Sequence, residues 1–123
     1  MSAALYGAVI AEHFRRPRNQ GALDAPDAAH EDVNPLCGDR VRIELRIASD
    51  RIAAARFKGD ACMVAVAAAS LLTGMLEGMT LAEAAAFPEA RLLEALQAPL
   101  RPSRVGCALL PLRVARAALR GRP

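Results

Sequence analysis

Three cysteines in separate segments of the chain carry its most distinctive chemistry: Cys37, Cys62 and Cys107. Cys37 lies in the segment Asn34–Asp39 (NPLCGD), where a carboxylate follows it by two residues. Three thiolates and Asp39 together offer four metal ligands, and soft thiolates select zinc, Cu(I) or iron–sulfur clusters. Zinc fingers and ribbons gather their cysteines in closely spaced pairs, which this chain lacks. A metal site here must therefore be assembled by the tertiary fold.

A second interpretation of the cysteines stays open, because free cysteines are often buried as small hydrophobic residues. Cys62 fits that role best, since it opens a stretch rich in alanine, valine and leucine. Cys37 fits it least, since Pro35, Gly38 and Asp39 around it are typical of a surface turn. Asp39 alone is an ordinary turn carboxylate, and only the neighbouring cysteines make it a candidate ligand.

The first third of the sequence predicts one helix and a loop region. Apolar residues recur at helical spacing over residues 3–15, and Pro17 ends that helix. Residues 22–39 are rich in loop-forming residues, with room for one short strand around His30–Val33. The turn that carries Cys37 therefore lies just before the next regular element.

The middle of the sequence predicts a hairpin and a buried helix. Apolar and charged residues alternate strictly over Arg40–Ile47, which indicates a half-buried strand. Ile52–Lys58 predicts its antiparallel partner, joined through a turn at Ser49-Asp50. Residues 61–77 are apolar nearly all round at helical spacing, so this helix is expected to pack against the sheet.

The last third predicts three helices. Thr80–Glu83 has the pattern of a capping box, and Pro88 opens a further helix that ends at Leu96. A proline-punctuated connector at residues 98–103 precedes the final helix, which is expected from about Cys107 to Arg120. Pro111 is tolerated in the first turn of a helix, where its missing N–H is not needed, and that favours a helix start at Cys107.

These elements predict an α+β fold in which about five helices pack on a small antiparallel β-sheet, as one domain over residues 1–123. Cys62 and Cys107 fall at predicted helix N-termini. The positive end of the helix dipole stabilises a thiolate there, and the thiolate is the form that binds metal and attacks sulfur.

Composition narrows the classes of function. The chain has 123 residues, enough for one domain with a proper core, and a net charge of +3. Its 16 basic residues are interspersed with 13 acidic ones, and aromatic residues make up only 3%, which argues against nucleic-acid binding. Solvated basic faces, or a surface for an acidic protein partner, are the better interpretations. The arginines gather near the two ends of the chain, at Arg15, Arg16, Arg18, Arg113, Arg116, Arg120 and Arg122.

The sequence also predicts a cytoplasmic protein with no membrane segment. The longest apolar stretch, Ala61–Leu76, is interrupted by polar residues and falls short of the ~20 residues that span a bilayer. No secretory signal is apparent, and an odd number of cysteines points to a reducing compartment. Classical catalysis is poorly supported, because neither His13 nor His30 neighbours a cysteine in sequence.

The order of the motifs resembles a known family. Leu5–Phe14 followed by Pro17–Gly21 resembles the opening of the IscU/NifU/SufU-type iron–sulfur cluster assembly scaffolds. Asn34–Asp39 resembles their first-cysteine motif closely, and Ala55–Cys62 with the Ala/Ser-rich helix after it resembles their second-cysteine segment. Cys107 falls where their third cysteine belongs. The resemblance covers nearly the whole chain in the right order, and the combination of motifs is specific.

The resemblance implies a SufE/IscU-like architecture on which Cys37, Cys62 and Cys107 hold a transient [2Fe-2S] cluster or a zinc ion. Asp39 would be the fourth ligand or a control on cluster release. Sulfur would arrive as persulfide from a cysteine desulfurase, and clusters would pass to apo iron–sulfur acceptor proteins. We expect Cys107 to accept the sulfur, because it is predicted to start a helix after a mobile connector.

The chain departs from the family pattern at several positions. Gly106 stands before the third cysteine, where the family usually has histidine or another basic residue, and Ala61 replaces the usual glycine before Cys62. Residues 98–105 lack the Leu-Pro-Pro-Val-Lys segment by which IscU members engage an Hsp70-type chaperone, which argues against that partner. The 45 positions from Cys62 to Cys107 leave no room for the extra segment typical of SufU members.

Three functions remain open from the sequence. The leading one is a scaffold and sulfur acceptor that is not an enzyme. The second is a zinc-dependent sulfurtransferase partner that relays persulfide without building a cluster. The third is a divergent interaction module without metal. The colour and metal content of the protein after anaerobic isolation distinguish the three.

Overall fold

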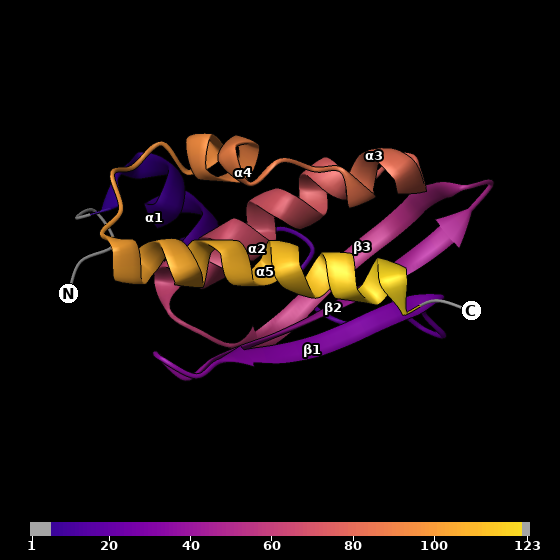
Figure 1. Cartoon of the computed structure of the whole chain (residues 1–123), viewed down its shortest axis with the longest axis horizontal. Coiled ribbons are helices and arrows are strands. Elements are labelled where there is room, and N and C mark those ends of the chain that lie inside the picture. Colours follow the sequence, from indigo (N-terminus) through magenta and orange to yellow (C-terminus); the bar gives the residue numbers. More distant parts are fainter. Residues whose placement is uncertain (1–5, 122–123) are drawn as a thin grey trace.

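The computed structural model describes residues 6–121, and it confirms the expected α+β class. Five helices pack on a three-stranded antiparallel sheet among these residues (Figure 1). Along the chain the elements are α1 (Ala8–Arg15), β1 (Ala28–Asn34), β2 (Asp39–Ala48), β3 (Arg51–Asp60), α2 (Met63–Leu76), α3 (Leu81–Ala85), α4 (Glu89–Leu96) and α5 (Pro102–Arg120).

The sheet has the order β1-β2-β3, with both neighbouring pairs antiparallel. The alternation predicted for the second strand is confirmed, because Val41, Ile43 and Leu45 are buried on one face. Ser49 and Asp50 form the β2–β3 turn and both have positive φ, as a tight two-residue hairpin turn requires. The register pairs residue 34 with residue 39 at one end of the sheet. The pairing of β1 with β2 therefore fixes both ends of the turn that joins them.

α2 and α5 lie side by side on one face of the sheet, and the other helices pack around them (Figure 1). α2 is buried along most of its length, which explains why its sequence is apolar nearly all round. α1 packs against α2, and α4 packs against both α2 and α5. The core therefore lies between the sheet and the pair α2–α5, and it anchors the elements that carry the cysteines.

The predicted capping box is confirmed at the start of α3. Thr80 accepts a hydrogen bond from the backbone N–H of Glu83, and the Glu83 carboxylate accepts one from the backbone N–H of Thr80. α4 starts one residue after Pro88, as expected. Within residues 6–121, none of the helices is both long and apolar enough to cross a membrane.

The predicted start of the final helix was wrong. α5 begins at Pro102, five residues before Cys107, and Pro111 lies inside the helix rather than in its first turn. Proline is well suited to a first helical position, and Pro102 takes that role. Burial of α5 against the sheet outweighs the ~3 kcal/mol that an interior proline such as Pro111 costs.

The predicted start of the first helix was also too early. α1 begins at Ala8, because Gly7 has a φ of 96°, a left-handed conformation that interrupts a helix. Residues 3–5 of that expectation lie outside the described residues.

Candidate metal centre

The β1–β2 turn positions Cys37 and Asp39. The carbonyl oxygen of Asn34 accepts hydrogen bonds from the backbone N–H groups of Cys37 (3.3 Å) and Gly38 (2.7 Å), and the Asn34 side chain accepts one from Leu36 (3.1 Å). Gly38 has a φ of 76°, which closes the turn. Cys37 is exposed at the tip, whereas Asp39 is buried as the first residue of β2.

α5 brings Cys107 to the same place from the other side. Cys107 is fully buried, and its sulfur lies 3.2 Å from the Cys37 sulfur. Ser103, one helical turn earlier, offers its carbonyl oxygen to the Cys107 thiol at 3.7 Å. Because Cys107 sits inside a helix rather than at its start, its position is set by the packing of α5 and not by a mobile connector.

Cys37, Asp39 and Cys107 form a three-donor group. One sulfur from each cysteine and one carboxylate oxygen all lie within 4.8 Å of one another. Asp39 Oδ2 is buried and has no hydrogen-bond partner among the described residues, and leaving such an oxygen unsatisfied is costly. A cation would satisfy that oxygen, and two thiolates with a carboxylate are ligands that zinc accepts. The residues present therefore fit a metal.

Cys62 meets this group through its backbone. As the N-cap of α2, it donates its N–H to Asp39 Oδ1 at 2.9 Å. Its sulfur is not among the donor atoms that lie within 4.8 Å of one another, so the expected convergence of all three thiols stays a prediction for Cys62. Cys62 also lines a pocket of about 210 Å³ together with Tyr6 and Arg104.

Burial and neighbouring groups shift the pKa values of Asp39 and Cys107. Burial favours a higher pKa for Asp39, but the nearby Cys37 thiol, the hydrogen bond from the Cys62 N–H and the nearby Cys107 thiol outweigh it and hold the pKa below its usual value. Burial, followed by the contact with the Cys37 thiol and the nearby Asp39 carboxylate, raises the pKa of Cys107 far above the usual value for a thiol. Without a metal, Asp39 is the anion of the group and Cys107 keeps its proton.

Arg104 is a site residue that the sequence analysis missed. Arg104 lines the pocket beside Cys62, and interactions with Cys107, then with the nearby Tyr6 and Cys62, raise the pKa of its guanidinium. Arg104 lies three residues before Cys107, and residues at that spacing on a helix are neighbours. The sequence could not indicate this proximity because the helix was expected to start only at Cys107.

Gly106 lies close to the residue that holds the β1–β2 turn. A Cβ placed there would lie 3.4 Å from the side-chain nitrogen of Asn34, an ordinary van der Waals distance. The basic residue nearest to Cys107 along α5 is Arg104, on the preceding turn.

The two histidines lie away from the three-donor group. His13 Nδ1 is 2.7 Å from the hydroxyl of Ser70, which ties α1 to α2. His30 lies on β1, with Nε2 3.9 Å from an Asp32 carboxylate oxygen. Within residues 6–121, no histidine joins the group of possible metal ligands.

Comparison with known proteins agrees with this architecture. The chain is 34% identical over 119 residues to the iron–sulfur cluster assembly scaffold protein IscU of Azotobacter vinelandii, covering 94% of this chain and 91% of that protein. It is 39% identical over 75 residues to the zinc-dependent sulfurtransferase SufU of Bacillus subtilis, covering 60% of this chain. The chain spans half the length of that SufU.

A solved structure shares the fold. The N-terminal part of a nitrogen-fixing NifU-like protein from Brucella abortus superposes with a TM-score of 0.75 at 21% identity, covering 94% of this chain and 92% of that one. The family described as the NifU-like N terminal domain matches residues 5–121 of the sequence. The chain therefore belongs to the NifU-like N-terminal domain family.

Proposed function

We propose that this chain is an iron–sulfur cluster assembly scaffold, which receives sulfur from a cysteine desulfurase and passes clusters to apo acceptor proteins. Its cargo is a transient [2Fe-2S] cluster or a zinc ion, held by Cys37, Asp39, Cys62 and Cys107. The observation that carries the proposal is the grouping of two sulfurs and one carboxylate oxygen within 4.8 Å. Family membership and the similarity to an IscU scaffold over 94% of the chain support it.

The proposed ligands differ in how firmly they are fixed. Cys107 is buried in a packed helix and serves as the fixed ligand, whereas Cys37 is exposed in a turn and can be reached by a partner. Asp39 offers a carboxylate oxygen, which binds iron more weakly than a thiolate does. A ligand set of this kind suits a protein that must release its cargo.

Cys62 is proposed as the fourth ligand because of where its backbone lies. Its N–H holds one oxygen of Asp39, so the start of α2 borders the three-donor group directly. Cys62 and Arg104 both line the neighbouring pocket. Cys62 is thus the one remaining thiol that can complete a set of four metal ligands.

We propose Cys37, and not Cys107, as the first acceptor of sulfur. Cys107 is fully buried, so an outside persulfide cannot reach it, whereas Cys37 is exposed at the turn. The Cys37 thiolate attacks the outer sulfur of the desulfurase persulfide. A sulfur–sulfur bond forms on Cys37, the bond within the donor persulfide breaks, and the desulfurase cysteine leaves as a thiolate.

A zinc-dependent sulfurtransferase is the second candidate function. The 39% identity to the Bacillus subtilis SufU favours it, and the same ligands would serve. Zinc would then remain bound by Asp39 and the thiolates, while sulfur passes through the exposed thiol without cluster assembly.

Anaerobic isolation tests these functions. A scaffold is expected to be brown, with iron and acid-labile sulfide, or to take up both on reconstitution. Colourless protein with one zinc per chain that takes up no cluster on reconstitution would favour the sulfurtransferase. Protein that binds neither metal would contradict both and leave an interaction module. Cys107→Ser should lose metal in either case.

Persulfide mapping tests the route of sulfur. After incubation with a desulfurase and cysteine, mass spectrometry of alkylated peptides should find the extra sulfur first on Cys37, and Cys37→Ser should abolish it. Sulfur that appears first on Cys107, with Cys37→Ser unaffected, would refute this assignment.

A further inference from the structure

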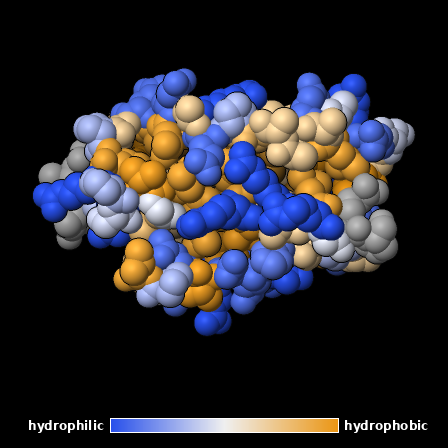
Figure 2. Space-filling model, in the orientation of Figure 1, coloured by the Kyte–Doolittle hydropathy of each residue, from blue (hydrophilic) through white to orange (hydrophobic). Residues whose placement is uncertain are grey.

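The outer face of α5 carries a row of arginines along its C-terminal half. Arg113, Arg116 and Arg120 follow at spacings of three and four residues, so they project from one side of the helix. We call these three residues the arginine ridge. α5 contains four arginines and no acidic residue, so this one helix contributes +4 to a chain whose net charge is +3. Figure 2 shows hydrophilic side chains across the middle of the face where α5 lies, with hydrophobic surface beside them.

A groove of about 430 Å³ runs beside the ridge, between α3 and the last turns of α5. Its walls are mostly apolar, with two ridge arginines among them. The lining residues are Leu81, Ala82, Ala85, Leu119, Arg116 and Arg120. α3 is only five residues long and its outward alanines are small, so this gap is left unfilled. The groove can take one or two large aliphatic side chains.

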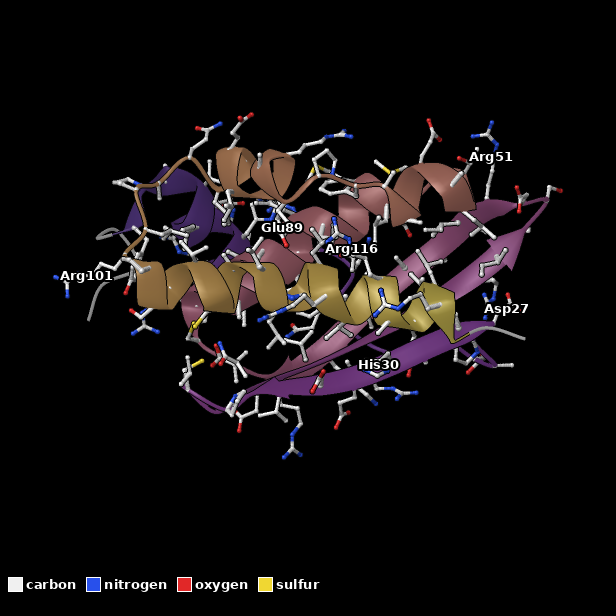
Figure 3. All side chains as sticks on the ribbon, viewed as in Figure 1. Asp27, His30, Arg51, Glu89, Arg101 and Arg116 are labelled. Carbon is white, nitrogen blue, oxygen red and sulfur yellow. The ribbon has the colours of Figure 1, made fainter. Side chains whose placement is uncertain are left out.

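The ridge has cationic capacity that the described residues do not use. A guanidinium nitrogen of Arg116 lies 3.7 Å from a carboxylate oxygen of Glu89, and another donates to the Phe87 carbonyl oxygen. The third guanidinium nitrogen, Nε, is buried and has no acceptor within residues 6–121. Figure 3 shows Arg116 and Glu89 beside each other, with His30 on the other side of α5. Arg113 donates to the carbonyl oxygen of Gly106 at 3.2 Å, but neither Arg113 nor Arg120 has a carboxylate within 4.0 Å in the described part of the chain.

We propose that the arginine ridge and the α3–α5 groove form a docking surface for an acidic amphipathic helix of a partner protein. Carboxylates of that helix pair with Arg113 and Arg120, and its apolar side chains enter the groove. A helix is the natural occupant, because it presents apolar residues on one side and flanking carboxylates at the same three- and four-residue spacings as the ridge.

The neighbouring apolar groove is the reason to favour a protein helix over nucleic acid. Single-stranded nucleic acid binds through cations that pair with its phosphates and aromatic side chains that stack on its bases, and this groove offers alanine and leucine in place of aromatics. Arg116 and Arg120 lie nine and thirteen residues beyond Cys107, which is about 14 and 20 Å along a helix. We expect a partner held at Arg116 and Arg120 to leave Cys37 accessible, so that docking and sulfur or metal transfer can occur together.

Peptide binding tests the proposal. The probe is a fluorescein-labelled helical peptide of about eighteen residues, with leucines on one face and flanking glutamates, measured by fluorescence anisotropy at low and high salt. Two matched peptides replace the glutamates with lysines or the leucines with serines. We expect micromolar binding of the first peptide only, weakened at high salt because ions screen exposed charges.

Protein variants locate the surface. The pair Arg113→Glu and Arg120→Glu should weaken binding at least about tenfold, and Ala85→Trp should weaken it by filling the groove. The control pair Arg15→Glu and Arg16→Glu changes the net charge equally on the exposed face of α1 and should have no effect. Should the charge-reversed ridge fail to fold by circular dichroism, the glutamine pair at the same positions replaces it.

Three outcomes would overturn the proposal: equal binding of the acidic and lysine peptides, equal weakening by the control pair, or no peptide binding at all. Tighter binding of a labelled single-stranded DNA, lost in the same ridge variant, would assign the surface to nucleic acid instead. Metal content is measured in parallel and should be unchanged in every ridge variant, so a failed docking test says nothing against the scaffold function.

Discussion

Asp39 has two carboxylate oxygens with different surroundings. Oδ1 accepts a hydrogen bond from the backbone N–H of Cys62, and Oδ2 is buried without a partner in the described residues. The first contact fixes the orientation of the carboxylate, and the second oxygen is thereby directed where a cation can use it. The side chain is thus oriented before any metal arrives.

Replacing Asp39 should show how much of the metal affinity depends on this oxygen. We expect Asp39→Ala to weaken zinc binding by about tenfold or more, because the remaining ligands leave a position for water. Asp39→Cys should restore or tighten it. Competition with a chromophoric zinc chelator measures both. Unchanged affinity in Asp39→Ala would leave Asp39 with only a structural role in the turn.

His13 should make the stability of the fold depend on pH. Burial, followed by the nearby Arg18 charge, lowers the pKa of His13 below 6.5, although Glu12 works the other way. The unfolded chain therefore binds a proton more readily than the folded one, and stability should fall as pH drops below about 6.5. Urea unfolding at pH 7.5 and 5.5 measures this. In His13→Gln that difference should shrink, and an undiminished difference would assign it to other groups.

At the scale of the elements, the contact between α1 and α2 depends on Ser70. Its hydroxyl oxygen is 2.7 Å from His13 Nδ1 and accepts a hydrogen bond from the backbone N–H of Arg18 at 2.8 Å. One buried side chain on α2 thereby holds both the end of α1 and the turn that follows it.

Two glycine-to-alanine substitutions should change the stability of the fold in opposite directions, one through a close backbone contact and the other through helix propensity. A Cβ at Gly59 on β3 would lie 2.1 Å from the carbonyl oxygen of Arg40, next to Asp39 on β2. Gly59→Ala should therefore destabilise the fold by about 1 to 3 kcal/mol. Gly74 on α2 is exposed and has nothing within 4 Å, so Gly74→Ala should stabilise the fold by about 0.5 to 1 kcal/mol. Thermal unfolding measures both, and effects of the same sign would contradict this account.

At the scale of the whole molecule, the metal centre joins parts of the chain that are distant in sequence. Cys37 and Asp39 come from the β1–β2 turn and Cys107 comes from α5, so a bound metal cross-links the sheet to the helical layer. The arginine ridge lies on the same helix and begins about two turns beyond Cys107. α5 thus carries both the buried ligand Cys107 and the exposed ridge.

Zinc should therefore stabilise the folded protein by an amount that grows with the logarithm of the free zinc concentration. At a hundredfold excess over Kd the gain is about 2.7 kcal/mol, because only the folded chain assembles the ligands. Differential scanning fluorimetry with a zinc titration measures it, and excess chelator should reverse it. Cys107→Ser should lose most of the shift, and a shift that persists in this variant would place zinc elsewhere.

The sequence by itself was sufficient to predict most of the helices and strands and the proximity of Cys37 and Asp39. The alternation in β2, the Ser49-Asp50 turn and the capping box at Thr80 are signals carried by residues within a few positions of one another. Cys37 and Asp39 are two residues apart in one turn, so their proximity was also predictable. The single-domain expectation for residues 1–123 stays a prediction.

The tertiary structure alone decided where the distant residues lie. The start of α5 at Pro102 depends on packing that outweighs the interior Pro111, and this buries Cys107 and places Arg104 one helical turn before it. Cys62 lines a pocket together with residues of other segments, which no local pattern encodes. The groove beside the arginine ridge exists because α3 is too short to cover α5. Side-chain direction and unfilled space are set by contacts between elements, and those contacts form only when the chain has folded.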